Sequence, residues 1–170
     1  MSESFLILGG ARSGKSGRAL ALAEQLGETR AYIATAEALD PEMAARIAHH
    51  QQERNAGWVT IEAPLNLVEA IDAKPAEIEV CLIDCLTLWL SNLMHHQEDA
   101  DHATDALCQA VQAASVPIIM VSNEVGMGLV PDTSLGRQFR DAQGRLNQAM
   151  AATCDRVEFV AAGLSLKLKG

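Results

Sequence analysis

Short apolar runs alternate along this chain with longer segments in which apolar residues recur every three or four positions. Apolar runs of roughly four to eight residues are typical of buried strands, and the longer period is typical of helices that bury one face. The alternation predicts an α/β fold: a mainly parallel sheet flanked by helices on both faces, with ligands at the carboxyl ends of the strands. The expected strands are residues 5–8, 31–34, 58–61, 80–83, 118–121 and 157–161, with 164–168 as a further edge strand.

A glycine-rich segment follows the first apolar run and precedes an alanine- and leucine-rich stretch, residues 18–26. It fits the pattern G-x-x-x-x-G-K-[ST]. Its residues are Gly9, Gly10, Ala11, Arg12, Ser13, Gly14, Lys15 and Ser16. Glycines let successive N–H groups surround a polyphosphate at the positive end of a helix, while the lysine neutralises phosphate charge and the serine hydroxyl binds Mg²⁺. The alternative is a glycine-rich turn that binds nothing, but the strand–loop–helix context favours a P-loop NTPase-like domain.

Composition narrows the class of protein further. At 18.2 kDa the 170 residues suit a single domain spanning 1–170, because chains of about 150 residues bury roughly 70% of their unfolded surface. The net charge of −9 argues against a nucleic-acid or anionic-membrane surface. No cationic leader pattern and no apolar stretch near the ~20 residues of a membrane span are found, so we expect a soluble cytoplasmic protein. The four cysteines match neither a zinc site nor a redox pair, and we expect reduced thiols in or near the core.

Residues 40–42, Asp-Pro-Glu, are a helix-start signal, and we expect a helix that ends near Arg54. Projected at 100° per residue, one arc of roughly 100° holds Met43, Arg46, Ile47, His50 and Arg54. His49 lies about 100° away from His50 in this projection. If the apolar pair faces the protein body, two arginines and a histidine are brought inward, which favours an anionic partner. The alternative is a pair of snorkelling arginines beside a surface histidine.

Two of the predicted strands end in residues that suit a nucleotide. The second strand ends in the small residues Ala34, Thr35 and Ala36. They either allow a nucleotide to approach the backbone closely or serve packing alone. Glu62 ends the third strand before a proline, and it is either a ribose or base contact or only a charge at a helix start.

Asp84 directly follows the apolar residues 80–83. This pattern matches the second motif of P-loop proteins, in which a strand-end carboxylate beside the loop helps to hold Mg²⁺. The alternative is a cap for the helix expected from about Leu86. That helix is apolar enough to be mostly buried, and we expect Trp89 in the core.

His95, His96 and His102 lie in an acidic, poorly patterned stretch. We interpret it as a solvated loop rather than a metal site. Residues 123–131 combine a polar pair at a strand end with two glycines, which predicts a mobile loop over the edge that carries the phosphate site.

A further helix is expected from Ser134 onward, with Arg137, Asp141 and Arg145 spaced four residues apart. Residues at this spacing lie on one face of a helix. The pattern indicates either intrahelical ion pairs or recognition of an anionic substrate or a neighbouring subunit.

At these motifs the sequence resembles one family, the bifunctional adenosylcobinamide kinase / adenosylcobinamide-phosphate guanylyltransferase of cobalamin biosynthesis. The resemblance runs through essentially the whole chain. It is carried by the P-loop with its preceding leucine, Tyr-Ile-Ala-Thr-Ala at 32–36, Arg-Ile-Ala-His-His at 46–50 with Arg54 and Trp58, Leu-Ile-Asp-Cys-Leu-Thr at 82–87, Val-Ser-Asn-Glu-Val-Gly-Met-Gly-Leu-Val-Pro at 121–131, Phe-Arg-Asp at 139–141 and Gly-Arg-Leu-Asn-Gln at 144–148. The P-loop is generic, whereas the histidine helix and the loop at 123–131 are far more restricted. One departure is Asn55, where the family usually has proline, and it removes no reactive group.

The resemblance implies two reactions on one P-loop α/β scaffold that assembles as a homotrimer. The kinase step moves the γ-phosphoryl group of ATP or GTP to the aminopropanol hydroxyl of adenosylcobinamide. In the transferase step a histidine attacks the α-phosphorus of GTP and pyrophosphate leaves. The guanylyl group then passes to adenosylcobinamide phosphate to give adenosylcobinamide-GDP.

The resemblance assigns the nucleophile to His50, which lies four residues after Arg46 and four before Arg54. The helical projection selects the same histidine independently. One of these arginines would neutralise the phosphate beside it. A neutral imidazole is nucleophilic near its ordinary pKa of about 6.5. If the loop holds the β- and γ-phosphates, His50 must approach the α-phosphorus to within ~3–3.5 Å, so movement of this helix on GTP binding is a further hypothesis.

The remaining roles also follow from the resemblance. Lys15 would be catalytic with His50, stabilising the charge that develops in both transition states. Ser16 and Asp84 would hold Mg²⁺, with GTP and ATP as nucleotide substrates. The nucleotide contacts would come from the P-loop residues and from Ala34, Thr35, Ala36, Gln51, Gln52, Glu53, Arg54, Glu62 and Asp84.

Two other functions stay open from the residues alone. One is a small-molecule kinase that uses the P-loop for phosphoryl transfer while His50 is structural. The other is a non-catalytic switch or assembly protein whose loop binds GTP to control a partner.

Overall fold

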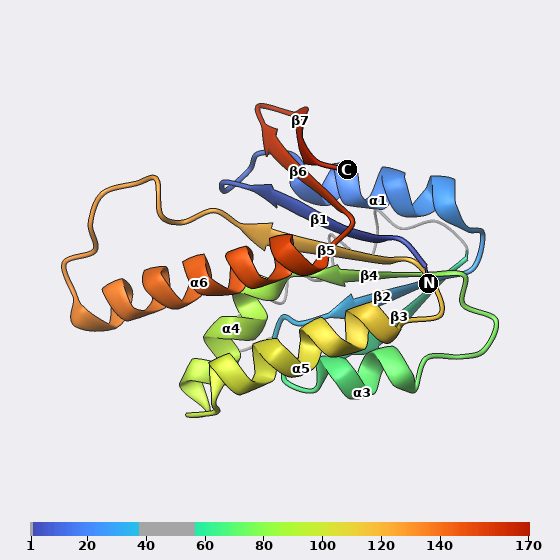
Figure 1. Ribbon diagram of the computed structural model, residues 1–170, viewed down its shortest axis with the longest axis horizontal. Helices are drawn as coiled ribbons and strands as arrows, with labels where there is room; N and C mark the ends of the chain where they lie inside the picture. The colour runs from blue at the N-terminus through green and yellow to red at the C-terminus, as the bar shows by residue number, and fades with distance from the viewer. Residues whose placement is uncertain (1, 38–56) are drawn as a thin grey trace.

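The computed structural model describes residues 2–37 and 57–170. It has one seven-stranded sheet with the strand order β3-β2-β4-β5-β1-β6-β7. All neighbouring strands are parallel except β7, which runs antiparallel to β6 (Figure 1). In chain order the elements are β1 (Ser4–Gly9), α1 (Lys15–Leu26), β2 (Arg30–Ala34), β3 (Trp58–Glu62), α3 (Leu67–Asp72), β4 (Val80–Asp84), α4 (Leu86–His95), α5 (Ala100–Ala113), β5 (Ile118–Asn123), α6 (Ser134–Thr153), β6 (Arg156–Ala161) and β7 (Leu164–Lys169).

All seven expected strands are present, each longer than predicted by one or two residues. The predicted fold class is confirmed, because α1 covers one face of the sheet and α3, α4, α5 and α6 cover the other (Figure 1). The helices expected near residue 86 and from Ser134 are confirmed as α4 and α6. The helix expected over residues 40–54 lies outside the described residues.

The solvated loop predicted around three histidines is only partly correct. His95 is the last residue of α4, and His102 lies in the first turn of α5. A carboxylate oxygen of Asp99 accepts the His102 backbone N–H at 3.0 Å. Carboxylates stabilise the positive end of a helix, so the acidic stretch that resembled a loop starts a helix instead.

Two apolar layers follow from the alternation of side chains along each strand. In β1, Ile7 packs toward α1, whereas Leu6 and Leu8 join the cluster built with the helices of the opposite face. Trp89 is only 2% exposed, and its indole N–H donates to the Leu65 carbonyl at 2.8 Å. The prediction that Trp89 belongs to the core is therefore confirmed.

The cysteines are free thiols, as expected. Cys81, Cys85 and Cys154 are buried and Cys108 is partly buried. Within residues 2–37 and 57–170, the helices are too short or too polar to span a lipid bilayer.

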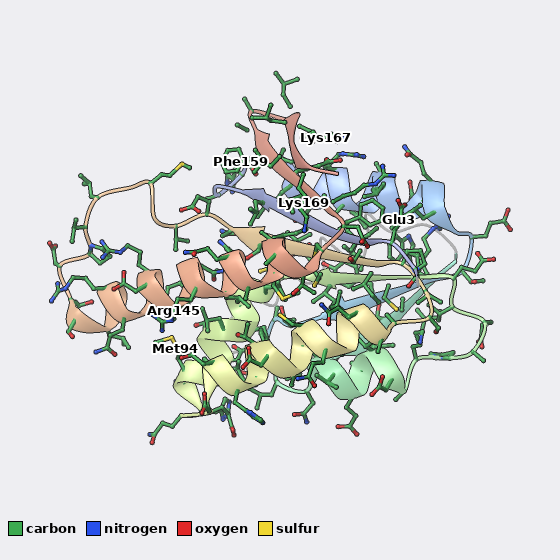
Figure 2. All side chains as sticks on the ribbon, viewed as in Figure 1. Glu3, Met94, Arg145, Phe159, Lys167 and Lys169 are labelled. Carbon is green, nitrogen blue, oxygen red and sulfur yellow. The ribbon has the colours of Figure 1, made fainter. Side chains whose placement is uncertain are left out.

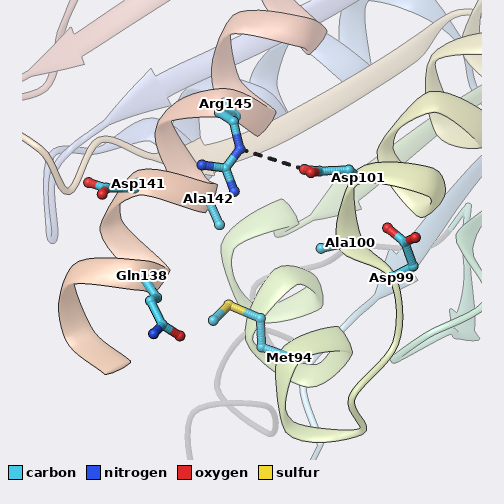
Figure 3. A pocket seen from close by; sticks show the side chains of 8 residues that line it. All are labelled: Met94, Asp99, Ala100, Asp101, Gln138, Asp141, Ala142 and Arg145. Carbon is cyan, nitrogen blue, oxygen red and sulfur yellow. Dashed lines mark ion pairs between the residues drawn. The ribbon is translucent and has the colours of Figure 1, made fainter. Parts of the chain in front are cut away.

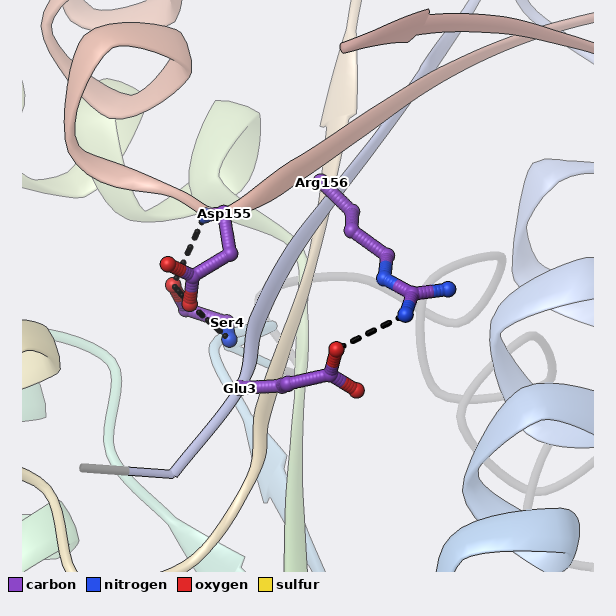
Figure 4. A network of polar contacts seen from close by, with 4 residues as sticks. All are labelled: Glu3, Ser4, Asp155 and Arg156. Carbon is purple, nitrogen blue, oxygen red and sulfur yellow. Dashed lines mark hydrogen bonds and ion pairs between the residues drawn. The ribbon is translucent and has the colours of Figure 1, made fainter. Parts of the chain in front are cut away.

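Polar contacts fasten the start of the first strand to the start of β6 (Figure 4). The Asp155 carboxylate accepts both the backbone N–H and the hydroxyl of Ser4 at 2.8 Å, and these bonds lower the pKa of Asp155. Glu3 and Arg156 form an ion pair at 2.8 Å beside them. Lys169, labelled in Figure 2, donates to the Cys154 carbonyl at the end of α6. A cation at this position stabilises the negative end of a helix.

The strand order was not predicted from the sequence. Asp84 was expected beside the phosphate loop, and β5 lies between its strand β4 and the loop strand β1. The carboxyl end of β5 therefore lies in the sheet between Asp84 and the loop. Because neighbours in a sheet are set by long-range pairing, the order of apolar runs along the chain does not reveal this insertion.

Candidate nucleotide site

The loop between β1 and α1 is folded tightly against its own lysine. Lys15 begins α1 and is only 9% exposed, and its ammonium donates to the Gly10 carbonyl at 3.0 Å. Gly14 precedes the helix with a φ of 96°, in the left-handed region that glycine tolerates best. The hydroxyl of Ser13 is buried and has no hydrogen-bond partner in the described part of the chain. Free donors at the positive end of a helix suit a phosphate group.

Gly9 has a steric requirement of its own. A Cβ atom added there would lie 2.4 Å from the Ser13 hydroxyl oxygen and 2.5 Å from the Val160 carbonyl oxygen. The second neighbour is backbone of the adjacent strand β6 and has little freedom to move. The motif glycine is therefore required by the approach of β6 as well as by the loop.

The turn between β6 and β7 supports the loop from outside. The Gly163 N–H donates to the Ser13 carbonyl at 2.8 Å. Next to this contact, Arg18 of α1 makes two hydrogen bonds, at 2.8 and 2.7 Å, to the carboxylate of Glu158 in β6. The hydrogen bond from Arg18 lowers the pKa of Glu158, so this carboxylate stays charged. The hairpin thus fixes both the loop and the first turn of α1.

The structure brings the three predicted strand-end residues to one level of the sheet. Ala34 of β2 pairs with Glu62 of β3 on one side and with Asp84 of β4 on the other. The Asp84 carboxylate accepts a hydrogen bond from the Tyr32 hydroxyl at 3.2 Å, and Glu62 is exposed. Tyr32 is a contact that the sequence reasoning missed, although it lies in the motif at 32–36.

Thr35 is fully buried and bound to the end of β4. Its hydroxyl donates to the Cys85 carbonyl and accepts the Cys85 N–H, both at 2.8 Å. The Asp84–Cys85 peptide bond beside it is cis. With its hydroxyl so engaged, Thr35 contributes to the site by holding the backbone after Asp84.

The oxygen donors here fit Mg²⁺. Ser16 lies in the first turn of α1, and β4 directs Val80 and Leu82, the residues that alternate with its strand-end Asp84, into the layer that packs on α1. Mg²⁺ keeps several waters and takes one or two protein oxygens together with substrate phosphates. A hydroxyl and one carboxylate are a donor set of the kind this ion uses.

Seven residues singled out from the sequence lie within residues 38–56 and so outside the described residues. They are Arg46, His49, His50, Gln51, Gln52, Glu53 and Arg54. Their predicted roles stay predictions.

The charged residues of α6 do not pair along the helix as one interpretation expected. Arg137 donates to the carbonyls of Pro131 and Asp132, while Asp141 pairs with its neighbour Arg140 at 3.0 Å. Arg145 instead reaches Asp101 of α5 at 3.6 Å. The ladder is thus replaced by a pair of adjacent residues within α6 and by contacts with a preceding turn and another helix, which a spacing of four residues does not predict.

Arg145 and Asp101 stand at one side of a pocket of about 340 Å³ (Figure 3). The pocket is lined by Met94, Asp99, Ala100, Asp101, Gln138, Asp141, Ala142 and Arg145. It lies among α4, α5 and α6, and its lining shares no residue with the phosphate loop.

Comparison with known proteins gives the family of the chain. The chain matches the family model described as cobinamide kinase / cobinamide phosphate guanyltransferase over residues 5–168. It is 46% identical over 167 residues to the bifunctional adenosylcobalamin biosynthesis protein CobP of Pseudomonas aeruginosa, covering 97% of this chain and 96% of the relative. It is 41% identical over 180 residues to the bifunctional adenosylcobalamin biosynthesis protein CobU of Escherichia coli, covering 97% and 99%.

Solved structures add a likeness in fold. A KaiC-like protein of Pyrococcus horikoshii superposes with a TM-score of 0.51 at 12% identity, covering 92% of this chain and 71% of that one. Identity this low shows the fold alone. The full-length match to the family model and to both relatives is specific, and the chain belongs to the cobinamide kinase / cobinamide phosphate guanyltransferase family.

Proposed function

We propose that this chain phosphorylates adenosylcobinamide with ATP or GTP and then transfers the guanylyl group of GTP to adenosylcobinamide phosphate. The observation that carries the proposal is the family match over residues 5–168, which includes an intact phosphate loop. The chain also covers nearly the full length of relatives whose names describe bifunctional enzymes.

In the kinase step the aminopropanol hydroxyl oxygen bonds to the γ-phosphorus, the β–γ bridging bond breaks, and the hydroxyl proton leaves to solvent. The N–H groups of the loop and the positive end of α1 would hold the β- and γ-phosphates. Lys15 would exchange the Gly10 carbonyl for phosphate oxygens, and losing such a donor costs about 100-fold or more in rate.

Bound Mg²⁺ would neutralise charge on the β- and γ-phosphate oxygens. The hydroxyl of Ser16 and the carboxylate of Asp84 would hold it. Tyr32 would keep the Asp84 carboxylate oriented through its hydrogen bond.

In the transferase step we assign the nucleophile to His50. A neutral imidazole nitrogen would bond to the α-phosphorus as the α–β bridging bond breaks and pyrophosphate leaves. The phosphate oxygen of adenosylcobinamide phosphate would then take the guanylyl group from the imidazole. Arg46 or Arg54 would neutralise the phosphate charge.

The nucleotide contacts complete the proposed site. The edge where Ala34 lies level with Glu62 and Asp84 supports a role for these strand ends. Ala34 and Ala36 would allow close approach, with Thr35 holding the backbone. Glu62 would contact the guanosine, and Gln51, Gln52, Glu53 and Arg54 would be further nucleotide contacts.

Incubation with GTP labelled at the α-phosphate tests the proposal. We expect a covalent, acid-labile adduct that is lost in His50→Ala and retained in His49→Ala, the adjacent control. If no adduct forms while phosphorylated cobinamide is still made, the chain is a simple kinase. Absence of both products would favour the non-catalytic GTP switch.

We further propose a cytoplasmic homotrimer. In support, the segment before α6 exposes large apolar side chains, among them Met127, Leu129 and Val130, and Leu129 is 97% exposed. Exposed apolar patches mark contact surfaces. Sedimentation equilibrium should give three times the chain mass, and a monomer mass across the micromolar range would refute the trimer. Cell fractionation should recover the protein with cytoplasmic enzymes.

A further inference from the structure

The carboxyl end of β5 lies between the two halves of the phosphate site. Asn123, its last residue, pairs with Gly9, the first residue of the phosphate loop. Asp84, the last residue of β4, pairs with Val121 on the other edge of β5. Strands rise about 3.3 Å per residue, so Asn123 stands roughly 7 Å beyond the level of Asp84 and beside Gly9 of the loop.

The side chain of Asn123 belongs to the face of the sheet that carries α1. Alternate residues of β5, Ile119 and Val121, are fully buried in the layer packed on α1, and Asn123 continues that alternation. Asp84 follows Leu82 into the same layer on β4. Asn123 is therefore the first polar side chain on this face of β5, and β5 lies between the strands that end in Gly9 and in Asp84.

The backbone of Asn123 is held from both sides. Its N–H donates to the hydroxyl of Thr87 in α4 at 2.8 Å. Its carbonyl accepts from the side-chain amide of Asn147 in α6 at 3.0 Å. In contrast, its own side-chain amide has no hydrogen bond with any residue in the described ranges, although the residue is partly buried.

A buried network behind the sheet fixes this arrangement. Ser122 and Gln143 are fully buried, and Asn147 is 7% exposed. The Asn147 side-chain oxygen accepts from the Ser122 hydroxyl at 2.7 Å and from the Gln143 amide at 3.0 Å. The Gln143 side-chain oxygen has no partner in the described part of the chain, but the bonds through Asn147 tie the end of β5 to α6.

We propose that the side-chain amide of Asn123 donates a hydrogen bond to the γ-phosphoryl group of the bound nucleoside triphosphate and is a catalytic residue of the kinase step. An amide suits this position because it donates without adding a charge, whereas a carboxylate would repel the phosphate. The carboxylate of the next residue, Glu124, is turned to the Gly126 N–H instead. This inference rests on the proposed kinase function and adds a group that the P-loop and Asp84 do not supply.

The proposed contact predicts that Asn123→Ala lowers the rates of the two reactions by different factors. In the transition state of the kinase step the charge of the transferring γ-phosphoryl group is spread over its three oxygens, so Asn123→Ala should lower kcat by about 100-fold, the loss typical of one oriented donor. In guanylyl transfer the γ-phosphate belongs to the leaving pyrophosphate, and the charge develops nearer the α-phosphorus. The rate of adduct formation at saturating GTP should therefore change less than threefold, on the order of ordinary context effects.

The experiment compares the parent chain with Asn123→Ala, Asn123→Asp and the matched control Asn66→Ala. Asn66 is exposed and its side chain makes no capping hydrogen bond, so its loss should leave both rates unchanged. Asn123→Asp should lower kinase kcat further than Asn123→Ala. Equal losses in both reactions, or a kinase kcat within threefold of the parent, would overturn the inference.

A binding measurement separates the inference from the proposed function. Titration calorimetry with ATP and with ADP reports the γ-phosphate contact without any acceptor. Asn123→Ala should reduce the preference for ATP over ADP by about 10-fold, the share of one charge-assisted hydrogen bond. An unchanged preference overturns the contact even if the parent is an active kinase. A reduced preference in a chain that phosphorylates no cobinamide supports the contact while refuting the proposed substrate.

Discussion

Replacing Gly9 with alanine should distort the phosphate loop from its first residue. The added methyl group would lie 2.4 Å from the Ser13 hydroxyl oxygen and 2.5 Å from the Val160 carbonyl oxygen, well inside normal contact distance. The serine can rotate, but the carbonyl belongs to β6, which pairs with β1 along its length. Overpacking of such a site costs typically about 1–3 kcal/mol.

For a chain of this length, a loss of about 2 kcal/mol lowers Tm by roughly 4–8 °C. The displaced loop should also misplace the γ-phosphate, and an error near 1 Å costs about 100-fold in rate. Calorimetric unfolding and kinase kcat/KM measure the two effects. The matched control is Gly17→Ala in α1, where a Cβ would meet nothing within 4 Å and helix propensity should add about 0.5–1 kcal/mol of stability.

A second substitution tests which neighbour is decisive. Because the Val160 carbonyl cannot move aside, adding Ser13→Ala to Gly9→Ala should not restore stability. Recovery in that double variant, or an unchanged Tm and kcat/KM in Gly9→Ala alone, would refute the argument from β6.

Three further predictions concern the interior and the support of the loop. Asn147→Ala removes the hydrogen-bond partner of the Asn123 carbonyl and of the Ser122 hydroxyl. Two polar groups left without partners should lower the free energy of unfolding by about 2–5 kcal/mol, measured by urea titration. A loss below about 0.5 kcal/mol, the range of neutral surface changes, would contradict this prediction. The hydrogen bond from Arg18 holds the pKa of Glu158 below its ordinary 4.5. The stability that this carboxylate contributes is therefore complete above pH 4.5 and is lost as pH falls through the lowered pKa of the folded state. Glu158→Gln should make the free energy of unfolding fall less steeply on acidification, and parallel plots of that free energy against pH for the two proteins would contradict the prediction. Burial raises the pKa of the Cys85 thiol to about 12. A thiol reagent at pH 8 should therefore react readily only with the partly buried Cys108 in the folded chain, and with all four cysteines in guanidinium. Rapid reaction of all four thiols in the folded chain would refute the burial.

Much of the phosphate site could be predicted because it depends on residues that are neighbours in the chain. The turn, the lysine and the helix start lie within one loop, and backbone chemistry links those residue types directly to phosphate binding. Asp84 and Glu62 were likewise marked by their place at the ends of apolar runs. The edge that unites them follows from the parallel sheet that the alternation predicts.

Contacts between residues on different elements could not be predicted in the same way. Arg145 pairs with Asp101 on another helix, although its spacing suited a partner on its own helix. Thr35 looked like a small residue beside a nucleotide, but its hydroxyl is used to hold Cys85. A polar side chain can satisfy its hydrogen bonds in several ways, and packing between elements chooses among them.

The strands, the class of fold and the phosphate loop follow from the sequence alone, because periodicity and glycine chemistry act over a few consecutive residues. The position of β5 between the loop and Asp84 depends on long-range packing, and so does the buried contact of the Gln143 side chain with Ser122, 21 residues away in the chain. A pattern of burial records that a residue is covered but not which residue covers it. The pairing of β5 with β1 placed Asn123 beside Gly9, and this long-range contact gave the amide its proposed catalytic role.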